Sequence, residues 1–286
     1  MSNGNSALYV VATPIGNLGD ISPRALETLR SVNVIAAEDT RHSGRLLQHF
    51  GITTPCAALH EHNEREVCDS LIARLQRGDN VALISDAGTP LLNDPGYHLV
   101  STAHEHHIKV IPVPGPSSLV SALSASGLAA DRFVFEGFLP AKSAARRARI
   151  KQLKDEPRTV VMFEAPHRIS ACLSDLDDII GSDRVAVVAR ELTKAFETIR
   201  RDRLGVLADW VCADPNQQKG EFVIVLQGAP RTMAGDKDGG AARVLEVLLE
   251  DLPLKQAVTL AVKITGLGKN LLYDMAVKRQ QRQERE

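Results

Sequence analysis

Val81-Ala82-Leu83-Ile84 run directly into Ser85-Asp86-Ala87-Gly88-Thr89-Pro90, and Asn93-Asp94-Pro95-Gly96 follow shortly after. The four apolar residues are typical of a buried parallel strand. A strand that stops at Asp, Gly, Thr and Pro leaves free backbone N–H groups and small polar side chains at its carboxyl end. In open α/β sheets, ligands bind at that edge. The stretch therefore predicts an α/β protein with a ligand site after this strand, and Asp86 and Asp94 are candidate functional acids.

Apolar runs of strand length recur along the chain, and helical patterns lie between them. The expected strands are residues 8–12, 32–37, 81–84, 109–113, 133–135, 159–163, 184–189 and 222–227. The expected helices are residues 64–76, 116–126, 142–154 and 169–180, with a further helix that begins at Pro23 behind a Ser22 N-cap. Strands that alternate with helices predict α/β layers with largely parallel sheets. The first half is typical of a doubly wound sheet, whereas the second half is compatible with a parallel or a mixed sheet.

Breaks in composition divide the chain into four parts. We expect an N-terminal α/β domain over residues 7–123, a second α/β domain over 124–229, a flexible linker over 230–242 and a small helical region over 243–286. In the last part, two helices joined by Thr265-Gly266-Leu267-Gly268-Lys269 have a helix-turn-helix shape. That shape is either a nucleic-acid reader or an ordinary helical hairpin, and the segment leaves both open.

Composition predicts a soluble, cytoplasmic protein. The net charge of −1 over 286 residues gives no overall attraction to nucleic acid or to a membrane, so an anionic partner must meet a local patch. The four cysteines are widely spaced and include no CxxC pair, which disfavours structural zinc and a disulfide framework. The histidines lack the HxxxH spacing of a helical zinc site, so we expect no metal. No apolar run approaches the roughly 20 residues that span a bilayer.

Gly, Pro and charged residues follow nearly every expected strand. In the first half these segments are Thr13-Pro14-Ile15-Gly16-Asn17, Glu38-Asp39-Thr40-Arg41-His42 and Pro114-Gly115-Pro116-Ser117-Ser118. In the second half they are residues 136–140, 163–167, 190–194 and 219–221. Each alone is equally well a turn or a helix cap, but together they indicate a ligand cleft between the two α/β domains. Neither GxGxxG nor GxxxxGK[ST] occurs, which disfavours a dinucleotide-binding fold and a P-loop NTPase.

One expected helix, residues 142–154, gathers cations and contains no acid. Its basic residues are Lys142, Arg146, Arg147, Arg149, Lys151 and Lys154. A solvated helix face normally mixes both signs of charge, so this segment favours an anionic partner. A plain solvated face remains the alternative.

In their order along the chain, these motifs resemble the tetrapyrrole methylase superfamily. The resemblance is carried by residues 13–17, 37–41, 59–64, 85–90 with 93–96, 114–117, 136–140 and 190–194, and it covers nearly the whole chain. Members that methylate porphyrin precursors carry a GxGxGD-like first loop. Here that loop is Thr13-Pro14-Ile15-Gly16-Asn17, with no Asp at its end, which is similar to the branch that methylates ribosomal RNA.

The resemblance implies a two-domain α/β methyltransferase that is not of the Rossmann type, with S-adenosylmethionine held between the domains, and usually a homodimer. It implies metal-free 2′-O-methylation of a cytidine ribose in the decoding region of 16S rRNA, with the rRNA or the 30S subunit as partner. The alternative activity is C-methylation of a tetrapyrrole precursor. A non-catalytic RNA-binding assembly factor is a third possibility, which the dense Gly and Pro loops disfavour.

Site residues are expected from the same motifs. Backbone groups at strand ends are expected to bind the cofactor, at Pro14, Gly16, Asp86, Ala87, Gly88, Thr89, Pro90, Pro116, Ser117, Ser118, Phe163, Glu164, Ala189, Arg190, Glu191 and Leu192. Near the cationic sulfonium the cleft should present carbonyls or acids rather than Lys. A ribose hydroxyl is a weak nucleophile that needs a proton acceptor, and Asp39 and Glu61 are the candidates. The expected RNA-binding residues are Arg41, Lys142, Arg146, Arg147, Arg149 and Lys151.

Overall fold

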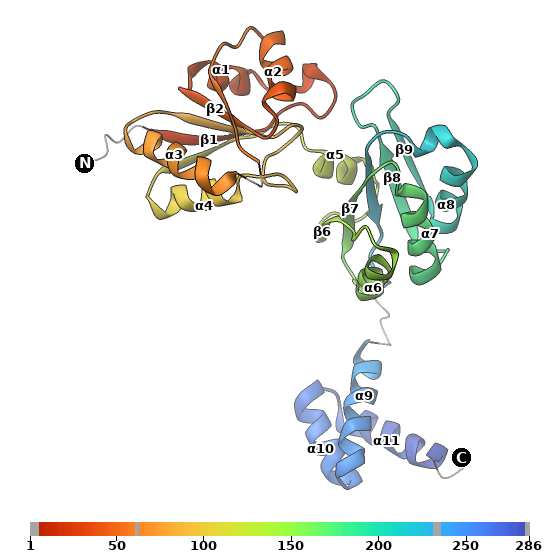
Figure 1. Ribbon diagram of the computed structural model, residues 1–286. Helices are drawn as coiled ribbons and strands as arrows, with labels where there is room; N and C mark the ends of the chain where they lie inside the picture. The colour runs from red at the N-terminus through yellow and green to blue at the C-terminus, as the bar shows by residue number, and fades with distance from the viewer. Residues whose placement is uncertain (1–5, 61–62, 231–235, 284–286) are drawn as a thin grey trace. The chain divides into compact units, whose positions relative to one another are not determined.

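The computed structural model describes residues 6–60, 63–230 and 236–283. The chain divides into two units, residues 1–228 and 229–286. The first unit contains two five-stranded sheets with their helices, and the second unit is helical (Figure 1). Among the described residues, we find no helix that is long and apolar enough to cross a membrane.

The first sheet is wholly parallel, as the alternation of strands and helices predicts. Its strands are β1 (Ala7–Val11), β2 (Val34–Ala37), β3 (Cys56–Ala58), β4 (Val81–Ile84) and β5 (Lys109–Val113), in the order β3-β2-β4-β1-β5. Every residue of β2 and β4 is buried, because helices cover both faces of the sheet.

Four helices and a 3-10 turn connect these strands. They are η1 (Leu18–Asp20), α1 (Pro23–Ser31), α2 (Thr40–His49), α3 (Glu64–Gln76) and α4 (Tyr97–Glu105). Side chains of α1 and α2 pack on one face of the sheet, and those of α3 and α4 pack on the other. The sheet is therefore doubly wound, and the strand ends stay free of covering helices.

The second sheet is mixed, which answers the question that the sequence left open. Its strands are β6 (Phe133–Phe138), β7 (Thr159–Glu164), β8 (Val185–Arg190), β9 (Thr198–Arg203) and β10 (Phe222–Leu226), in the order β6-β7-β10-β8-β9. Only β6 and β7 run parallel to each other, and the other neighbours are antiparallel.

One face of the second sheet is covered by α5 (Ser118–Ala125), which follows the last strand of the first sheet. Leu119, Ala122 and Leu123 of α5 pack with Val161 and Val223 of the sheet, and Ile15 joins the same cluster. By packing, α5 therefore belongs to the second sheet. The expected boundary between residues 123 and 124 stays a prediction; it falls inside α5, whereas the chain passes from one sheet to the other before Ser118.

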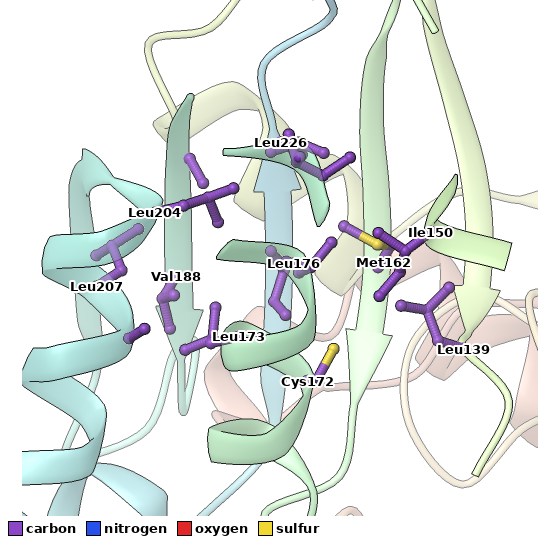
Figure 2. Close-up of a cluster of buried hydrophobic side chains, with 14 of the residues drawn as sticks. Leu139, Ile150, Met162, Cys172, Leu173, Leu176, Val188, Leu204, Leu207 and Leu226 are labelled. Atoms are coloured by element: carbon purple, nitrogen blue, oxygen red, sulfur yellow. The ribbon is translucent and has the colours of Figure 1, made fainter. Parts of the chain in front are cut away.

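The opposite face of the second sheet is covered by α6 (Ser143–Leu153), α7 (Ile169–Ile180) and α8 (Leu204–Ala213), and a 3-10 turn, η2 (Pro215–Gln218), follows α8. Figure 2 shows this apolar cluster, in which Leu173 and Leu176 of α7 lie with Met162 and Val188 of the sheet. These side chains are fully buried, so the cluster is the core of the second α/β half.

The second unit consists of α9 (Asp236–Asp251), α10 (Leu254–Thr265) and α11 (Lys269–Gln283). Its core includes Leu245 of α9, Val258 and Ala261 of α10, and Leu272 of α11. The expected linker over residues 230–242 is too long, because α9 already begins at Asp236. Three helices share this core: α10 and α11 are the expected pair joined by the turn at Gly266, and α9 packs against them.

We expect Leu173→Ala to lower the free energy of unfolding by about 2–5 kcal/mol, because it leaves a cavity in a closed core. Val206, an exposed residue of α8, is the control. Val206→Ala should change stability by less than about 0.5 kcal/mol. Urea unfolding of the two variants measures the difference, and equal effects would contradict the packing described for α7.

Candidate active site

The loops that follow β1 and β4 are joined backbone to backbone at Thr13 and Gly88. The Thr13 amide donates to the Gly88 carbonyl at 2.9 Å, and the Gly88 amide donates to the Thr13 carbonyl at 3.0 Å. Gly88 has a φ of 87°, where a side chain is unfavourable, and an added Cβ would lie 3.2 Å from Cγ2 of Ile15. The buried Thr13 hydroxyl also donates to the Ser85 carbonyl at 3.1 Å. The two loops thus form one fixed edge.

A cleft of about 340 Å³ opens at this edge, a volume within the range of small-molecule sites. On the first-sheet side it is lined by Ile15, Asp86, Ala87, Gly88, Thr89, Leu92, Asn93, Asp94, Ser117 and Ser118. On the second-sheet side it is lined by Phe138, Phe163, Glu164, Ala165, Pro166, Leu192, Glu221, Phe222 and Val223. Loops from both sheets therefore contribute to one cleft, as the strand-end motifs predict.

The charges in the cleft are negative. Asp86, Asp94, Glu164 and Glu221 are among its lining residues, although the Glu164 side chain is buried and paired with Arg168, and none of the described lining residues is Lys, Arg or His. The pKa of Asp94 is raised from 3.8 to about 7, chiefly by burial and also by the nearby carboxylates of Glu38 and Asp86, against a hydrogen bond with Ser85 that lowers it. The cleft is therefore suited to a ligand with a positive charge, and Asp94 can gain or lose a proton near neutral pH.

Glu164 forms the wall of the cleft at the end of β7. Its side chain has 0% exposed area, and its Oε1 lies 3.1 Å from Nε of Arg168 and accepts the Ala165 amide at 2.8 Å. Arg168 also donates to the Leu139 carbonyl. Beside it, the Phe163 ring meets the Phe135 and Phe138 rings edge to face, at centroid distances of 4.9 and 5.7 Å. This wall combines the buried Glu164 side chain with three Phe rings that contact one another.

The loop after β8 meets the loop after β1 beside the cleft. The Asn17 amide donates to Oγ1 of Thr193 at 3.2 Å. Glu191 holds the loop in shape, because its Oε1 accepts both Lys194 Nζ and the Glu221 amide at 2.9 Å. Glu191 and Thr193 adopt φ values of 51° and 66°, which residues other than glycine seldom do. This contact ties the two halves together next to Leu192.

All the expected cofactor-binding residues except Ala189 and Arg190 fall into two groups. Those that line the cleft are Asp86, Ala87, Gly88, Thr89, Ser117, Ser118, Phe163, Glu164 and Leu192. Those that adjoin lining residues without lining it themselves are Pro14, Gly16, Pro90, Pro116 and Glu191. Pro116 supports the lining indirectly, because its carbonyl accepts the Thr89 hydroxyl at 3.1 Å.

Ala189 and Arg190 do not present side chains to the cleft. Side chains alternate along β8: Ala189 packs in the cluster with α5, and Arg190 lies on the same face as Val188, where α7 and α8 pack. Asp214, at the end of α8, has a pKa lowered chiefly by the Asn216 amide and also by the Arg190 charge. Because its side chain lies on the other face of the sheet, Arg190 can make the predicted cofactor contact only through its backbone.

The two expected proton acceptors fare differently. Asp39 is the N-cap of α2: its Oδ1 accepts the amides of Arg41 at 2.7 Å and His42 at 3.4 Å, and these bonds lower its pKa. A carboxylate with a lowered pKa is a weaker base, and Asp39 is not among the residues that line the cleft. Glu61 lies outside the described residues.

The arginines of α6 are bound to acids of neighbouring elements. Arg146 Nε lies 2.7 Å from Asp175, and the exposed fractions of the two side chains are 6% and 10%. Arg147 pairs with Asp175 at 2.6 Å and with Asp178 at 2.9 Å, and Arg149 pairs with Glu136. The prediction that Arg146 binds RNA is wrong because its side chain is buried. For Arg147 and Arg149 the prediction is weakened, because the paired acids compensate their positive charges.

The remaining predicted RNA-binding residues, Arg41, Lys142 and Lys151, are exposed, and none of the ion pairs among the described residues involves them. Sequence reasoning did not assign the cleft residues Ile15, Leu92, Asn93, Phe138, Ala165, Pro166, Glu221, Phe222 and Val223. Most are apolar and carry no chemical signal of their own. Asp94 did carry a chemical signal, because it is an acid between a strand end and a Pro-Gly turn.

Two α/β sheets whose loops line one shared cleft define the class of two-lobed α/β methylases. A family model described as Tetrapyrrole (Corrin/Porphyrin) Methylases matches residues 7–208, which include every residue named above for β1 to β9. The chain belongs to the tetrapyrrole methylase family. A second model, described as the RsmI C-terminal HTH domain, matches residues 235–280 in the helical unit.

Curated relatives match over nearly the full chain. A protein of Pseudomonas aeruginosa named ribosomal RNA small subunit methyltransferase I is 59% identical over 274 residues, which cover 96% of this chain and 97% of that protein. Its namesake in Escherichia coli O157:H7 is 51% identical over 278 residues, with 97% of each covered. Within the family, the chain therefore groups with proteins of this name.

Solved structures share the fold at low sequence identity. The uroporphyrin-III-C-methyltransferase of Thermus thermophilus aligns with a TM-score of 0.53 and 19% identity, over 78% of this chain and 94% of that one. A cobalt precorrin-4 methyltransferase aligns with a TM-score of 0.55 and 16% identity, over 77% and 94%. These likenesses support the fold alone.

We expect Gly88→Val to lower the free energy of unfolding by about 1–3 kcal/mol, because valine is strained at this φ and would press on Ile15. Gly51 is the matched control: its φ is 62°, and an added Cβ there would meet nothing within 4 Å. Gly51→Val should cost less. Urea unfolding compares the two variants, and a Gly88→Val protein as stable as the wild type would contradict the constraint at this edge.

Proposed function

We propose that this protein transfers the methyl group of S-adenosylmethionine to the 2′-hydroxyl of a cytidine ribose in the decoding region of 16S rRNA. The choice of substrate is supported by the 59% and 51% identity, over nearly the whole chain, to proteins named ribosomal RNA small subunit methyltransferase I. The family match supports methyl transfer. A tetrapyrrole substrate has less support, because the porphyrin and corrin enzymes share only 16–19% identity with this chain.

The cleft fits S-adenosylmethionine, which combines an aromatic base, a ribose and a sulfonium cation. The Asp86 carboxyl group of the lining suits the cation, and the absence of basic side chains from the described lining avoids repulsion. Phe163, Leu192 and Val223 offer apolar contact for the base, and the backbone at Gly88 can approach a ligand closely because it has no side chain. When bound there, the cofactor supplies an electrophilic methyl group.

The RNA is held outside the cleft by exposed cations. Arg41 follows Asp39 at the start of α2, and the Asp39 amide donates to Asp86 of the cleft at 3.1 Å, so Arg41 lies near the rim. Lys142 and Lys151 of the α6 region are exposed as well. The helical unit, whose family model is named for a helix-turn-helix domain, is a further RNA-binding element.

The protein acts in the cytoplasm, as a homodimer.

Direct methyl transfer tests this function. The purified protein is incubated with labelled S-adenosylmethionine and either small ribosomal subunits that lack the modification or uroporphyrinogen III. We expect label in 16S rRNA only, at a single 2′-O-methylcytidine that mass mapping of nuclease fragments locates in the decoding region. Label in the tetrapyrrole, or in no substrate, would overturn the proposal.

We expect Lys142→Glu with Lys151→Glu to weaken binding to 16S rRNA and to reduce the slope of log affinity against log salt by about 0.7–0.9 for each lost phosphate contact. Stability should be unchanged, because both side chains are exposed. Arg146→Ala is the contrast: it exposes a buried pair and should lower the free energy of unfolding. Unfolding curves beside salt-dependent RNA titrations separate the two effects. An unchanged salt slope in the lysine variant would contradict the role of these residues.

A further inference from the structure

We infer that Asp94 is the group that accepts the proton of the ribose hydroxyl during methyl transfer. This inference rests on the proposed function, because it assigns a proton acceptor to that reaction. Asp94 lines the cleft together with Gly88 and Phe163, whereas Asp39 caps α2 outside it. The reaction needs such a group, since a ribose hydroxyl stays protonated at neutral pH and is then a weak nucleophile.

The loop that carries Asp94 is anchored on both sides of the cleft. Next to Asp94, Asn93 packs on β6 of the second sheet: its Oδ1 lies 2.6 Å from the place that a Cβ of Gly137 would occupy. After Asp94, the amides of Gly96 and His98 donate to Oε1 of Glu64 at 3.1 and 2.9 Å. A loop held from both directions keeps its carboxyl group in one place, which proton transfer requires.

Two carboxylates act on Asp94, and a third acid, Glu164, lines the same cleft but is paired with Arg168. Glu38 follows β2, Asp86 follows β4, and Glu164 stands across the cleft at the end of β7. Ser85 at the end of β4 is the hydrogen-bond partner of the Asp94 carboxyl group. Half-burial and two neighbouring carboxylates disfavour the ionised form, so Asp94 is a stronger base than an ordinary aspartate. A base that titrates near the working pH is the most effective kind.

The chemistry balances without a further reactant. The Asp94 carboxylate takes the 2′-hydroxyl proton while the ribose oxygen forms its bond to the methyl carbon. The bond between that carbon and the sulfonium sulfur breaks, and its electron pair stays on sulfur as a neutral thioether. The protonated Asp94 then releases its proton to water, and because its pKa is near neutral this return is rapid.

The kinetic test uses Asp94→Asn, with Asp69→Asn as control, because Asp69 is exposed on α3 and does not line the cleft. We expect Asp94→Asn to lower the single-turnover rate of methylation about 100-fold or more, and to change the affinity for S-adenosylmethionine, measured by calorimetry, less than about threefold. In the wild type, kcat/KM should rise with pH up to about 7 and then level off. This limb should be absent from the Asp94→Asn profile.

A second readout needs neither substrate nor cofactor. Because the pKa of Asp94 is raised from 3.8 to about 7, the native state binds this proton more tightly than the unfolded chain. Asp94 therefore costs stability progressively as pH rises between these values, and the cost is constant above them. Asp94→Asn lacks the cost, so its melting temperature relative to the wild type should increase from pH 5 to pH 7.5. Asp69→Asn should show no such trend.

Several outcomes would overturn the inference. One is an Asp94→Asn protein that methylates at more than a tenth of the wild-type rate. Another is a fall in cofactor affinity as large as the fall in rate, which would make Asp94 a partner of the sulfonium charge. A flat stability difference between pH 5 and 7.5 also counts against it. If the wild type itself fails to methylate small subunits, the proposed function fails, and the stability readout still reports on Asp94.

Discussion

Thr13 and Gly88 exchange two backbone hydrogen bonds, and these bonds fix the first-sheet edge of the cleft. The bonds hold the loops after β1 and β4 side by side, and they leave Ile15 projecting into the apolar cluster formed by α5 and the second sheet. The same cluster buries Leu119 and Leu123, so the first sheet reaches the second through one short loop and one helix. The hydrogen-bonded edge and this packing together bring loops of two sheets to one cleft.

Charge is distributed in a way that composition could not reveal. The net charge is close to zero, yet the described cleft lining carries acids and no bases. The most basic helix, α6, is largely neutralised within the fold, because Arg146, Arg147 and Arg149 pair with acids of β6 and α7. The buried Arg146–Asp175 pair is costly to break and holds α6 against α7. A cationic ligand is therefore favoured inside, whereas the exposed cations lie elsewhere.

Local signals in the sequence predicted much of the fold. The strand β4 and helix α3 have the predicted bounds, and the Ser22 hydroxyl accepts the Ala25 amide at 3.1 Å to begin α1. The strands β3 and β9 were missed. The first is a three-residue strand of Cys and Ala, and the second is an edge strand in which four of six residues are charged. Both strands form because they pair with a neighbouring strand, and that pairing cannot be predicted from the local sequence.

The site was predictable to the extent that its residues carry chemistry next to a strand end. Asp86, Gly88, Thr89 and Glu164 meet that condition and line the cleft. Arg146 shows the limit, because helix periodicity alone cannot tell that Asp175 of another helix faces it. The Asp39 carboxylate shows the same limit in another form, since a helix N-cap and a catalytic base share one local pattern.

Hydrogen–deuterium exchange of the full chain with S-adenosylhomocysteine tests the central claim, that one ligand is held by loops of both sheets. We predict slower exchange of backbone amides at residues 86–90 and 164–166 in the same titration, with no change at residues 243–276. Protection confined to the loops of one sheet, or to residues outside the cleft, would contradict the account.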